Sequence, residues 1–185
     1  MVSLTKYLQP LLTDWKYAGT ENFTHQVLYN NPEAFLRLPA ARALHLVQEE
    51  LKTKGISLKI FDAYRPYSVT RKMWEIVPDE RYAANPAKGS GHNRGIAVDL
   101  TLVDLETGAE LEMPTPFDNF TEKAHHTYMN LDSTVLANRQ LLRTTMEKHG
   151  FRPLITEWWH YFWSDGKTYP LMDFDFGTMR ALADK

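Results

Sequence analysis

Cysteine is absent from this chain of 185 residues, and the absence removes several kinds of site at once. Without thiols there is no disulfide framework, no thiolate zinc site, no iron–sulfur cluster and no cysteine nucleophile. A metal would have to be bound by histidine, aspartate or glutamate. Because a chain without cysteine is indifferent to redox conditions, the absence does not indicate a compartment.

The chain also lacks a strong net charge and a long apolar run. Its 21 basic and 23 acidic side chains give a formal net charge of −2, so we expect no binding to nucleic acid or to an anionic membrane surface. No run of about 18 apolar residues occurs, which predicts no membrane span. Lys6, Asp14 and Lys16 interrupt the region where a signal peptide would be apolar, so we expect no signal peptide and a cytoplasmic protein.

Internal repeats and low-complexity segments are missing as well, which excludes solenoids and long linkers. Hydrophobic residues make up 43% of the chain and charged residues 24%, as in ordinary globular proteins. The length suits one hydrophobic core better than two. We therefore predict a single compact domain over residues 1–185; the sequence does not indicate an oligomeric state.

Hydrophobic periodicity predicts a mixture of helices and strands. Pro39 suits the first turn of a helix and Gly55 its end. Because helices and strands do not alternate regularly, the pattern favours an α+β domain with a mainly antiparallel sheet and helices packed on it. Helices are expected within residues 32–55, 69–77 and 133–149, and strands within 56–62, 96–103, 109–113 and 157–163.

The strand expected over residues 96–103 carries a carboxylate. Its aliphatic residues share one face, and Asp99 lies on the other beside Ala97 and Thr101, which leaves room for a ligand or metal. The simpler interpretation is a solvent-facing aspartate on an edge strand. His92 precedes Asp99 by seven residues, and a turn at Gly95 could bring the imidazole to the carboxylate; a solvated loop histidine is again the simpler alternative.

A second candidate pair lies in "TEWWHYFW", where Glu157 and His160 are three residues apart. Residues with that spacing in a regular strand face opposite ways. The two side chains could share a site only if Glu157 preceded the strand on a turn or bulge and His160 lay inside it. The alternative is a core strand in which His160 bonds to a neighbour and Glu157 points outward.

Two histidines and one aspartate would leave an open tetrahedral position for water, which is the pattern of a catalytic zinc site. A structural site would be closed by a fourth side chain. Glu157 would then act from outside the ligand set and take a proton from the metal-bound water.

Several segments carry a resemblance to a known family. "DAYRP", "SGHNRGIAVDLTL" and "EWWHY" resemble the VanX-type D-alanyl-D-alanine dipeptidases, within the zinc D-Ala-D-Ala peptidase family with its S-x-H-x-x-G-x-A-x-D and E-x-x-H signatures. "WKYAGTENFT", "PTPFDNF", "AHH" and "FDF" are also similar, in the same order along most of the chain. The resemblance implies a Hedgehog/D,D-peptidase-like fold.

The resemblance also implies a role for each matching residue. His92, Asp99 and His160 match the ligands of one zinc ion per chain, and Glu157 matches the base that later protonates the leaving amine. Arg65 matches an arginine that steadies the tetrahedral intermediate, a task that suits a guanidinium fork.

Three further matches concern the ends of a small dipeptide substrate. Ser90 matches a residue near the substrate carboxylate, and Asp118 and Tyr17 match the end that receives the ammonium. His125 and His126 are expected to be structural or to support the ligands. The connection from Arg65 to Ser90 is shorter than in the resistance enzymes of the family, which leaves the tolerated substrate length open.

The predicted function is therefore zinc-dependent hydrolysis of D-Ala-D-Ala to two D-alanines. A D,D-carboxypeptidase or peptidoglycan endopeptidase on the same scaffold is an alternative, and a non-catalytic zinc-stabilised binding module is a second. Resistance to vancomycin-type antibiotics, peptidoglycan recycling and D-alanine scavenging would all use this reaction.

Overall fold

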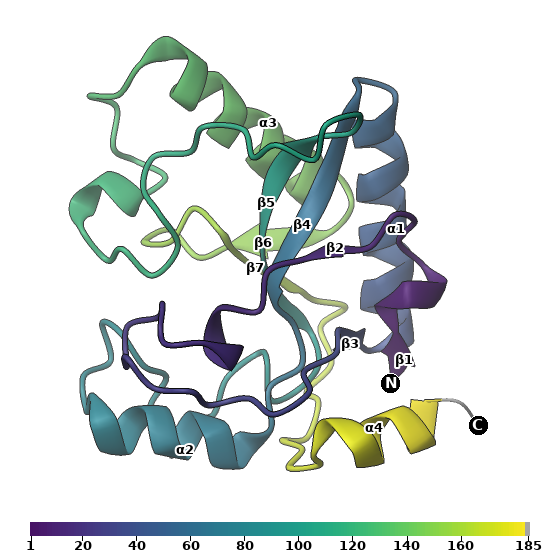
Figure 1. Cartoon of the computed structure of the whole chain (residues 1–185), viewed down its shortest axis with the longest axis vertical. Coiled ribbons are helices and arrows are strands. Elements are labelled where there is room, and N and C mark those ends of the chain that lie inside the picture. Colours follow the sequence, from purple (N-terminus) through teal and green to yellow (C-terminus); the bar gives the residue numbers. More distant parts are fainter. Residues whose placement is uncertain (184–185) are drawn as a thin grey trace.

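A five-stranded sheet forms the centre of the computed structural model, which describes residues 1–183 (Figure 1). The strand order is β2-β4-β5-β7-β6; β2 runs parallel to β4 and the other neighbours are antiparallel, which confirms the mainly antiparallel sheet. A two-stranded sheet joins β1 and β3. The strands are β1 Val2–Ser3, β2 Leu12–Thr13, β3 Phe35–Leu36, β4 Ile56–Asp62, β5 Ala97–Asp104, β6 Phe151–Pro153 and β7 His160–Trp163.

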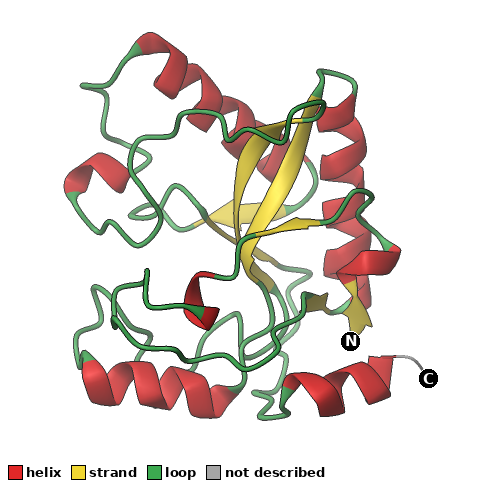
Figure 2. Cartoon of the chain, viewed as in Figure 1, coloured by secondary structure: helices red, strands yellow, loops and turns green. Residues whose placement is uncertain are grey.

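The helices over residues 38–52 and 133–148 cover one face of the central sheet, and long loops cover the other (Figure 2). None of the described helices is long and apolar enough to cross a bilayer. The α-helices are α1 Leu38–Lys52, α2 Tyr67–Ile76, α3 Ser133–Lys148 and α4 Phe176–Ala183, and the short 3₁₀ helices are η1 Leu4–Lys6, η2 Lys16–Ala18 and η3 Glu122–Ala124.

The two faces of β5 separate core packing from the polar site. Leu100 and Leu102 on one face belong to the same buried cluster as Leu44 of α1 and Leu142 of α3. Asp99 on the opposite face is only 3% exposed. Because β5 lies in the middle of the sheet and loops cover that face, the interpretation of Asp99 as a solvent-facing residue on an edge strand is wrong.

Three expected elements differ from the structure, and the first difference is that α2 begins at Tyr67 rather than after Ser68. The first helix begins at Leu38, since residues 35–36 pair with β1 as a strand instead. The strand expected over residues 109–113 is reduced to a single bridge between Val103 and Glu110. Pro114 and Pro116 follow closely, and proline cannot donate to a strand ladder, so the pairing does not extend.

Candidate metal centre

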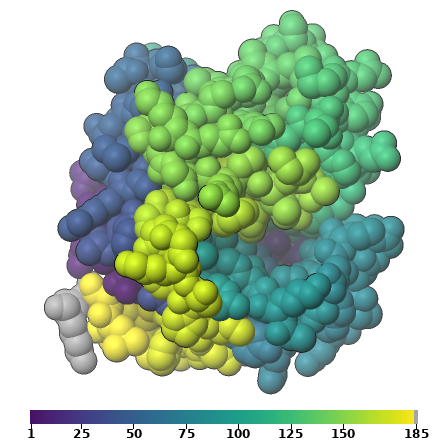
Figure 3. Space-filling view, turned by 180° about the vertical axis from the view of Figure 1, so that it is seen from behind, coloured from purple at the N-terminus to yellow at the C-terminus, as the bar shows by residue number. Residues whose placement is uncertain are grey.

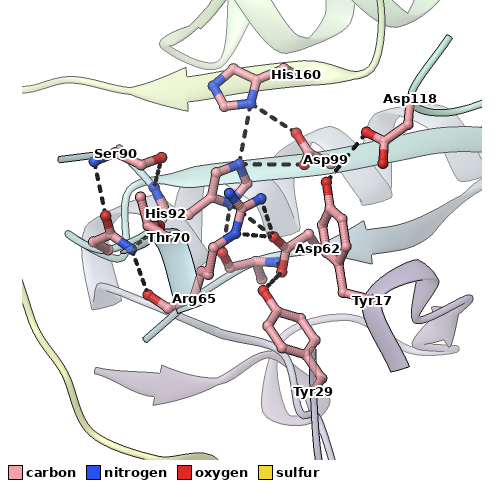
Figure 4. A network of polar contacts seen from close by, with 12 residues as sticks. Tyr17, Tyr29, Asp62, Arg65, Thr70, Ser90, His92, Asp99, Asp118 and His160 are labelled. Carbon is pink, nitrogen blue, oxygen red and sulfur yellow. Dashed lines mark hydrogen bonds and ion pairs between the residues drawn. The ribbon is translucent and has the colours of Figure 1, made fainter. Parts of the chain in front are cut away.

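Three side chains that could bind a metal converge where the loop before β5 meets the amino-terminal ends of β5 and β7. One ligand atom from each of His92, Asp99 and His160 lies within 4.8 Å of the others (Figure 4). Asp99 of β5 is the register partner of His160 of β7, and cross-strand partners point to the same face of a sheet. His160 Nδ1 lies 2.8 Å from Asp99 Oδ1 and 3.2 Å from His92 Nε2.

The loop before β5 delivers His92 to this pair. Gly95 adopts a φ of 69°, a conformation that glycine accepts without strain, and its amide donates to the His92 carbonyl in a tight turn. A side chain at Gly91 would meet the Ala97 Cβ at 2.9 Å, so the loop can lie this close to β5 only with glycine there. The predicted approach of His92 to Asp99 across the turn is confirmed.

The hydrogen bonds of His92 leave one ring nitrogen for a metal. Its Nδ1–H donates to the Ala63 carbonyl at 2.7 Å, so the neutral ring presents an unprotonated Nε2 to the centre. That nitrogen lies 3.4 Å from Asp99 Oδ2. Two imidazoles and a carboxylate form a donor set that suits zinc. His92 and Asp99 of this set are nearly fully buried.

Charges within the cluster hold Asp99 ionised. Burial alone would raise the pKa of Asp99, but His92 and His160 outweigh it and hold this pKa below its ordinary value. Burial opposes protonation of His92, whereas Asp99 favours it and raises the pKa of His92. Without a cation, the carboxylate therefore favours a proton on His92, and a metal ion would replace that proton.

Glu157 lies on the turn that precedes β7, which begins at His160. The strand expected over residues 157–163 therefore begins three residues late, which meets the condition under which Glu157 and His160 could share a site. The Glu157 amide donates to the Leu154 carbonyl, and the His160 amide donates to the Glu157 carbonyl. Burial raises the pKa of Glu157 to about 7, partly offset by His160.

Asp62, at the end of β4, is a site residue that the sequence reasoning missed. It is fully buried and accepts from Arg65 Nη2 at 2.7 Å, from Arg65 Nε at 3.0 Å and from the Tyr29 hydroxyl at 2.7 Å. Burial opposes the charge of Arg65, but Asp62, together with Tyr29, Tyr17 and Asp99, outweighs burial, and the pKa of Arg65 lies well above its ordinary value. The guanidinium is thereby held rigidly beside the ligand cluster.

A β-bulge in β4 places this carboxylate on the site face. Ile60 pairs with Leu100, and after a register shift Asp62 pairs with Asp99. Regular alternation would put Asp62 on the same face as Leu100, inside the helix-covered core. The extra residue, Phe61, packs on Phe117 of the covering loop instead.

Asn93 is a second buried residue that the sequence reasoning did not single out. Its side-chain amide donates to the Arg65 carbonyl and to Thr70 Oγ1, and its oxygen accepts from the Ser90 amide. Ser90 Oγ accepts from the His92 amide at 3.2 Å. Asn93 thus ties the loop that carries Ser90 and His92 to the start of α2.

These side chains surround a cavity of about 180 Å³. In Figure 3 it appears as a hollow between the green residues above and the teal residues below, with purple amino-terminal atoms at its floor. All eight predicted site residues line it: Tyr17, Arg65, Ser90, His92, Asp99, Asp118, Glu157 and His160; the others are Glu80, Tyr82, Ala83, Ala84, Phe120, Leu154 and Trp159.

Asp118 and Tyr17 form one end of the cavity. The Tyr17 hydroxyl donates to Asp118 Oδ1 at 3.3 Å (Figure 4). The Phe23 amide donates to Asp118 Oδ2, also at 3.3 Å. Burial raises the pKa of Asp118 to about 7. Asp118 has a φ of 58°, which aspartate tolerates better than most residues. When ionised, the Asp118 carboxylate could therefore bind a cation in the cavity.

His126 lies behind the turn that carries Glu157, where its main chain bonds to Ile155 of that turn. Its amide donates to the Ile155 carbonyl at 2.9 Å, and its buried ring packs edge-on against Tyr161. The Glu157 main chain lies near the His126 ring and favours the charged form of the imidazole. Neither ring nitrogen, however, makes a hydrogen bond of normal geometry. Burial dominates and lowers the pKa of His126 to about 4.

With this geometry in place, comparison with known proteins decides the family. The family model for D-Ala-D-Ala dipeptidases, of the M15 peptidases, matches residues 1–177. The chain belongs to this family. It is a metallopeptidase of the M15 group, and the His92, Asp99 and His160 cluster is consistent with the metal site typical of M15 zinc peptidases.

Individual relatives agree over most of the chain. A D-alanyl-D-alanine dipeptidase of Escherichia coli is 34% identical over 172 residues, which are 93% of this chain and 89% of the relative. A D-alanyl-D-alanine dipeptidase of Enterococcus faecium is 33% identical over 183 residues, covering 88% and 90%. A solved structure of the LdcB LD-carboxypeptidase overlaps 69% of this chain and 58% of its own, at 20% identity and a TM-score of 0.46.

Proposed function

We propose that this metallopeptidase is a zinc-dependent dipeptidase that hydrolyses D-Ala-D-Ala to two D-alanines. The observation that carries the proposal is the cavity itself, in which the cluster of His92, Asp99 and His160 shares about 180 Å³ with the buried Asp118. Pockets for drug-sized ligands occupy roughly 300–1,000 Å³, so this one suits a much smaller substrate. The dipeptidase relatives support the same substrate class.

Zinc bound to the three ligands would polarise the scissile carbonyl and lower the pKa of an attacking water. Glu157 lines the same cavity and takes the proton of that water, then returns it to the leaving amine. Its pKa of about 7 suits both transfers at neutral pH, because a base of lower pKa would accept the proton less readily.

Arg65 supplies fixed positive charge for the oxyanion of the tetrahedral intermediate. Its guanidinium is held by Asp62 and lies over the Tyr17 ring, 5.1 Å from the centroid. A donor that is already oriented stabilises developing charge without reorganising during the reaction.

The two ends of the substrate meet different groups. Asp118, with Tyr17 bonded to it, receives the ammonium, and Ser90 lies near the substrate carboxylate. A dipeptidase must recognise both termini of its substrate. A longer peptide has no free ammonium at this position, so it would leave the buried Asp118 carboxylate unpaired and bind less well. This penalty argues against the carboxypeptidase or endopeptidase alternative, whose substrates extend beyond a free ammonium.

The test is release of D-alanine from D-Ala-D-Ala by the full chain, with a chelator and after zinc is added back. We expect release that the chelator stops and zinc restores. A muropeptide with a blocked amino terminus is assayed in parallel. Cleavage of the muropeptide alone would establish the carboxypeptidase or endopeptidase alternative instead, and zinc binding without cleavage of either substrate would favour the binding module.

A further inference from the structure

A second, outer cavity adjoins the metal cavity and shares a wall with it. The outer cavity has a volume of about 350 Å³ and is lined by Phe23, Val77 and Thr121. Tyr82, Asp118 and Phe120 line both cavities. The residues that separate the two spaces are therefore also residues of the candidate active site.

Two aromatic rings form the wall. Tyr82 and Phe120 meet edge to face, with ring centroids 5.1 Å apart. Phe120 is further held by Phe23 and Trp159, at centroid distances of 5.8 and 5.9 Å. Tyr82 lies in a turn and is 38% exposed, so it is the side of the wall with less support from the core.

The position of Asp118 decides which part of the substrate meets this wall. In the proposed function, Asp118 receives the ammonium of the amino-terminal residue. The side chain of that residue is attached to the same carbon atom as the ammonium. When the ammonium contacts Asp118, the side chain must therefore also lie close to Asp118. Because Asp118 lines both cavities, this side chain is directed to the region where Tyr82 and Phe120 divide them.

We propose that Tyr82 and Phe120 limit the size of the substrate's amino-terminal side chain, and that the outer cavity is an apolar subsite which becomes accessible when Tyr82 is shortened. This inference rests on the proposed function. With the wall in place, a methyl group is accommodated and a branched aliphatic side chain collides with the rings. The Phe23, Val77 and Phe120 side chains give the subsite an aliphatic or aromatic preference.

The test compares three dipeptides, D-Ala-D-Ala, D-Leu-D-Ala and D-Ala-D-Leu, on the wild type, Tyr82→Ala and Tyr82→Phe. We expect Tyr82→Ala to raise kcat/KM for D-Leu-D-Ala relative to D-Ala-D-Ala by about tenfold or more, as for several methylenes newly accommodated. The ratio for D-Ala-D-Leu should stay unchanged. Tyr82→Phe keeps the ring and should keep the wild-type ratio of kcat/KM for D-Leu-D-Ala to kcat/KM for D-Ala-D-Ala.

An unchanged D-Leu-D-Ala ratio in Tyr82→Ala would overturn the inference, as would an equal gain for D-Ala-D-Leu. Calorimetric binding of the same dipeptides to zinc-loaded Glu157→Gln, with and without Tyr82→Ala, separates this inference from the proposed function. A shifted affinity ratio without turnover in the wild type would support the subsite and reject the reaction. Absence of binding by every dipeptide would reject both.

Discussion

Two carboxyl groups in the cavity, those of Glu157 and Asp118, are held close to half-protonation at neutral pH. Burial raises the pKa of each to about 7, from ordinary values near 4. The proposed tasks differ, since Glu157 transfers protons and Asp118 binds a cation. Their neighbours differ: Glu157 lies three residues from His160, a proposed metal ligand, whereas Asp118 accepts a hydrogen bond from Tyr17.

Replacing Glu157 by glutamine would remove the proposed proton acceptor and leave the three proposed metal ligands in place. We expect kcat for D-Ala-D-Ala to fall by about 100- to 10,000-fold, and zinc content to stay at one ion per chain. Glu80→Gln is the matched control, because Glu80 lines the same cavity but is exposed and paired with Lys88. Loss of zinc from Glu157→Gln would assign Glu157 to the metal ligands.

Asp118 predicts a pH dependence of substrate binding. Only its ionised form attracts the ammonium, and its pKa is raised, so affinity should fall as the pH drops through 7. Between pH 7.5 and 5.5 the ionised fraction decreases by about 20-fold, and Kd for D-Ala-D-Ala should rise by about the same factor.

Calorimetry on zinc-loaded Glu157→Gln measures this dependence without interference from Glu157. Adding Asp118→Asn should weaken binding at pH 7.5 and make Kd nearly independent of pH over this range. A steep pH dependence that persists without Asp118 would contradict its role at the ammonium.

At the scale of elements, the end of β4 and the loop before β5 form the frame of the site. The bulge directs Asp62 to Arg65, and the carbonyl of the next residue, Ala63, orients His92. Asn93 bonds to the Arg65 carbonyl from the loop side. Arg65, the proposed oxyanion-stabilising residue, and His92, a proposed metal ligand, are thus positioned by the same short segment.

Asp62→Ala should therefore destabilise the protein strongly. It leaves the buried Arg65 guanidinium without its partner, and breaking such a pair costs about 3–5 kcal/mol. Tyr29→Phe removes one hydrogen bond to the same carboxylate and should cost about 1 kcal/mol. Urea unfolding of both variants measures the free energies, and equal losses would show that the ion pair contributes no more than the tyrosine.

For the whole molecule, the three proposed metal ligands come from the loop before β5 and from two central strands. A metal ion that binds all three would join these segments and should stabilise the folded chain. At a free zinc concentration of about 1,000 times Kd, binding adds roughly 4 kcal/mol, which raises Tm by roughly 10 °C for a domain of this size. Thermal unfolding with chelator and with zinc measures the shift.

His92→Ala should lose this response to zinc. His149→Ala is the control, because His149 pairs with Glu50 away from the cluster and its loss should leave the zinc-induced shift intact. A full shift in His92→Ala would place the stabilising metal elsewhere.

Local patterns predicted much of this architecture but left particular positions open. The periodicity of 133–149 and the stop at Gly55 were sufficient for helices, because both depend on neighbours in the chain. The prediction of a strand after Gly108 was wrong. Strand pairing also requires an available edge, and the prolines that follow prevent the pairing from extending. Asp62 was missed because a bulge changes its face; its spacing of three residues from Arg65 was the only local signal.

The sequence by itself determined which chemical groups this protein has. These are histidine and carboxylate groups without thiols, a glutamate before an aromatic strand, and an arginine shortly after an aliphatic strand. These are properties of residue types and short spacings. Only the tertiary structure decided that Asp99 is central rather than at an edge, that Asp62 faces the site, and that two rings divide the cavity. Each depends on contacts between residues far apart in the chain, whose burial and distance no local pattern contains.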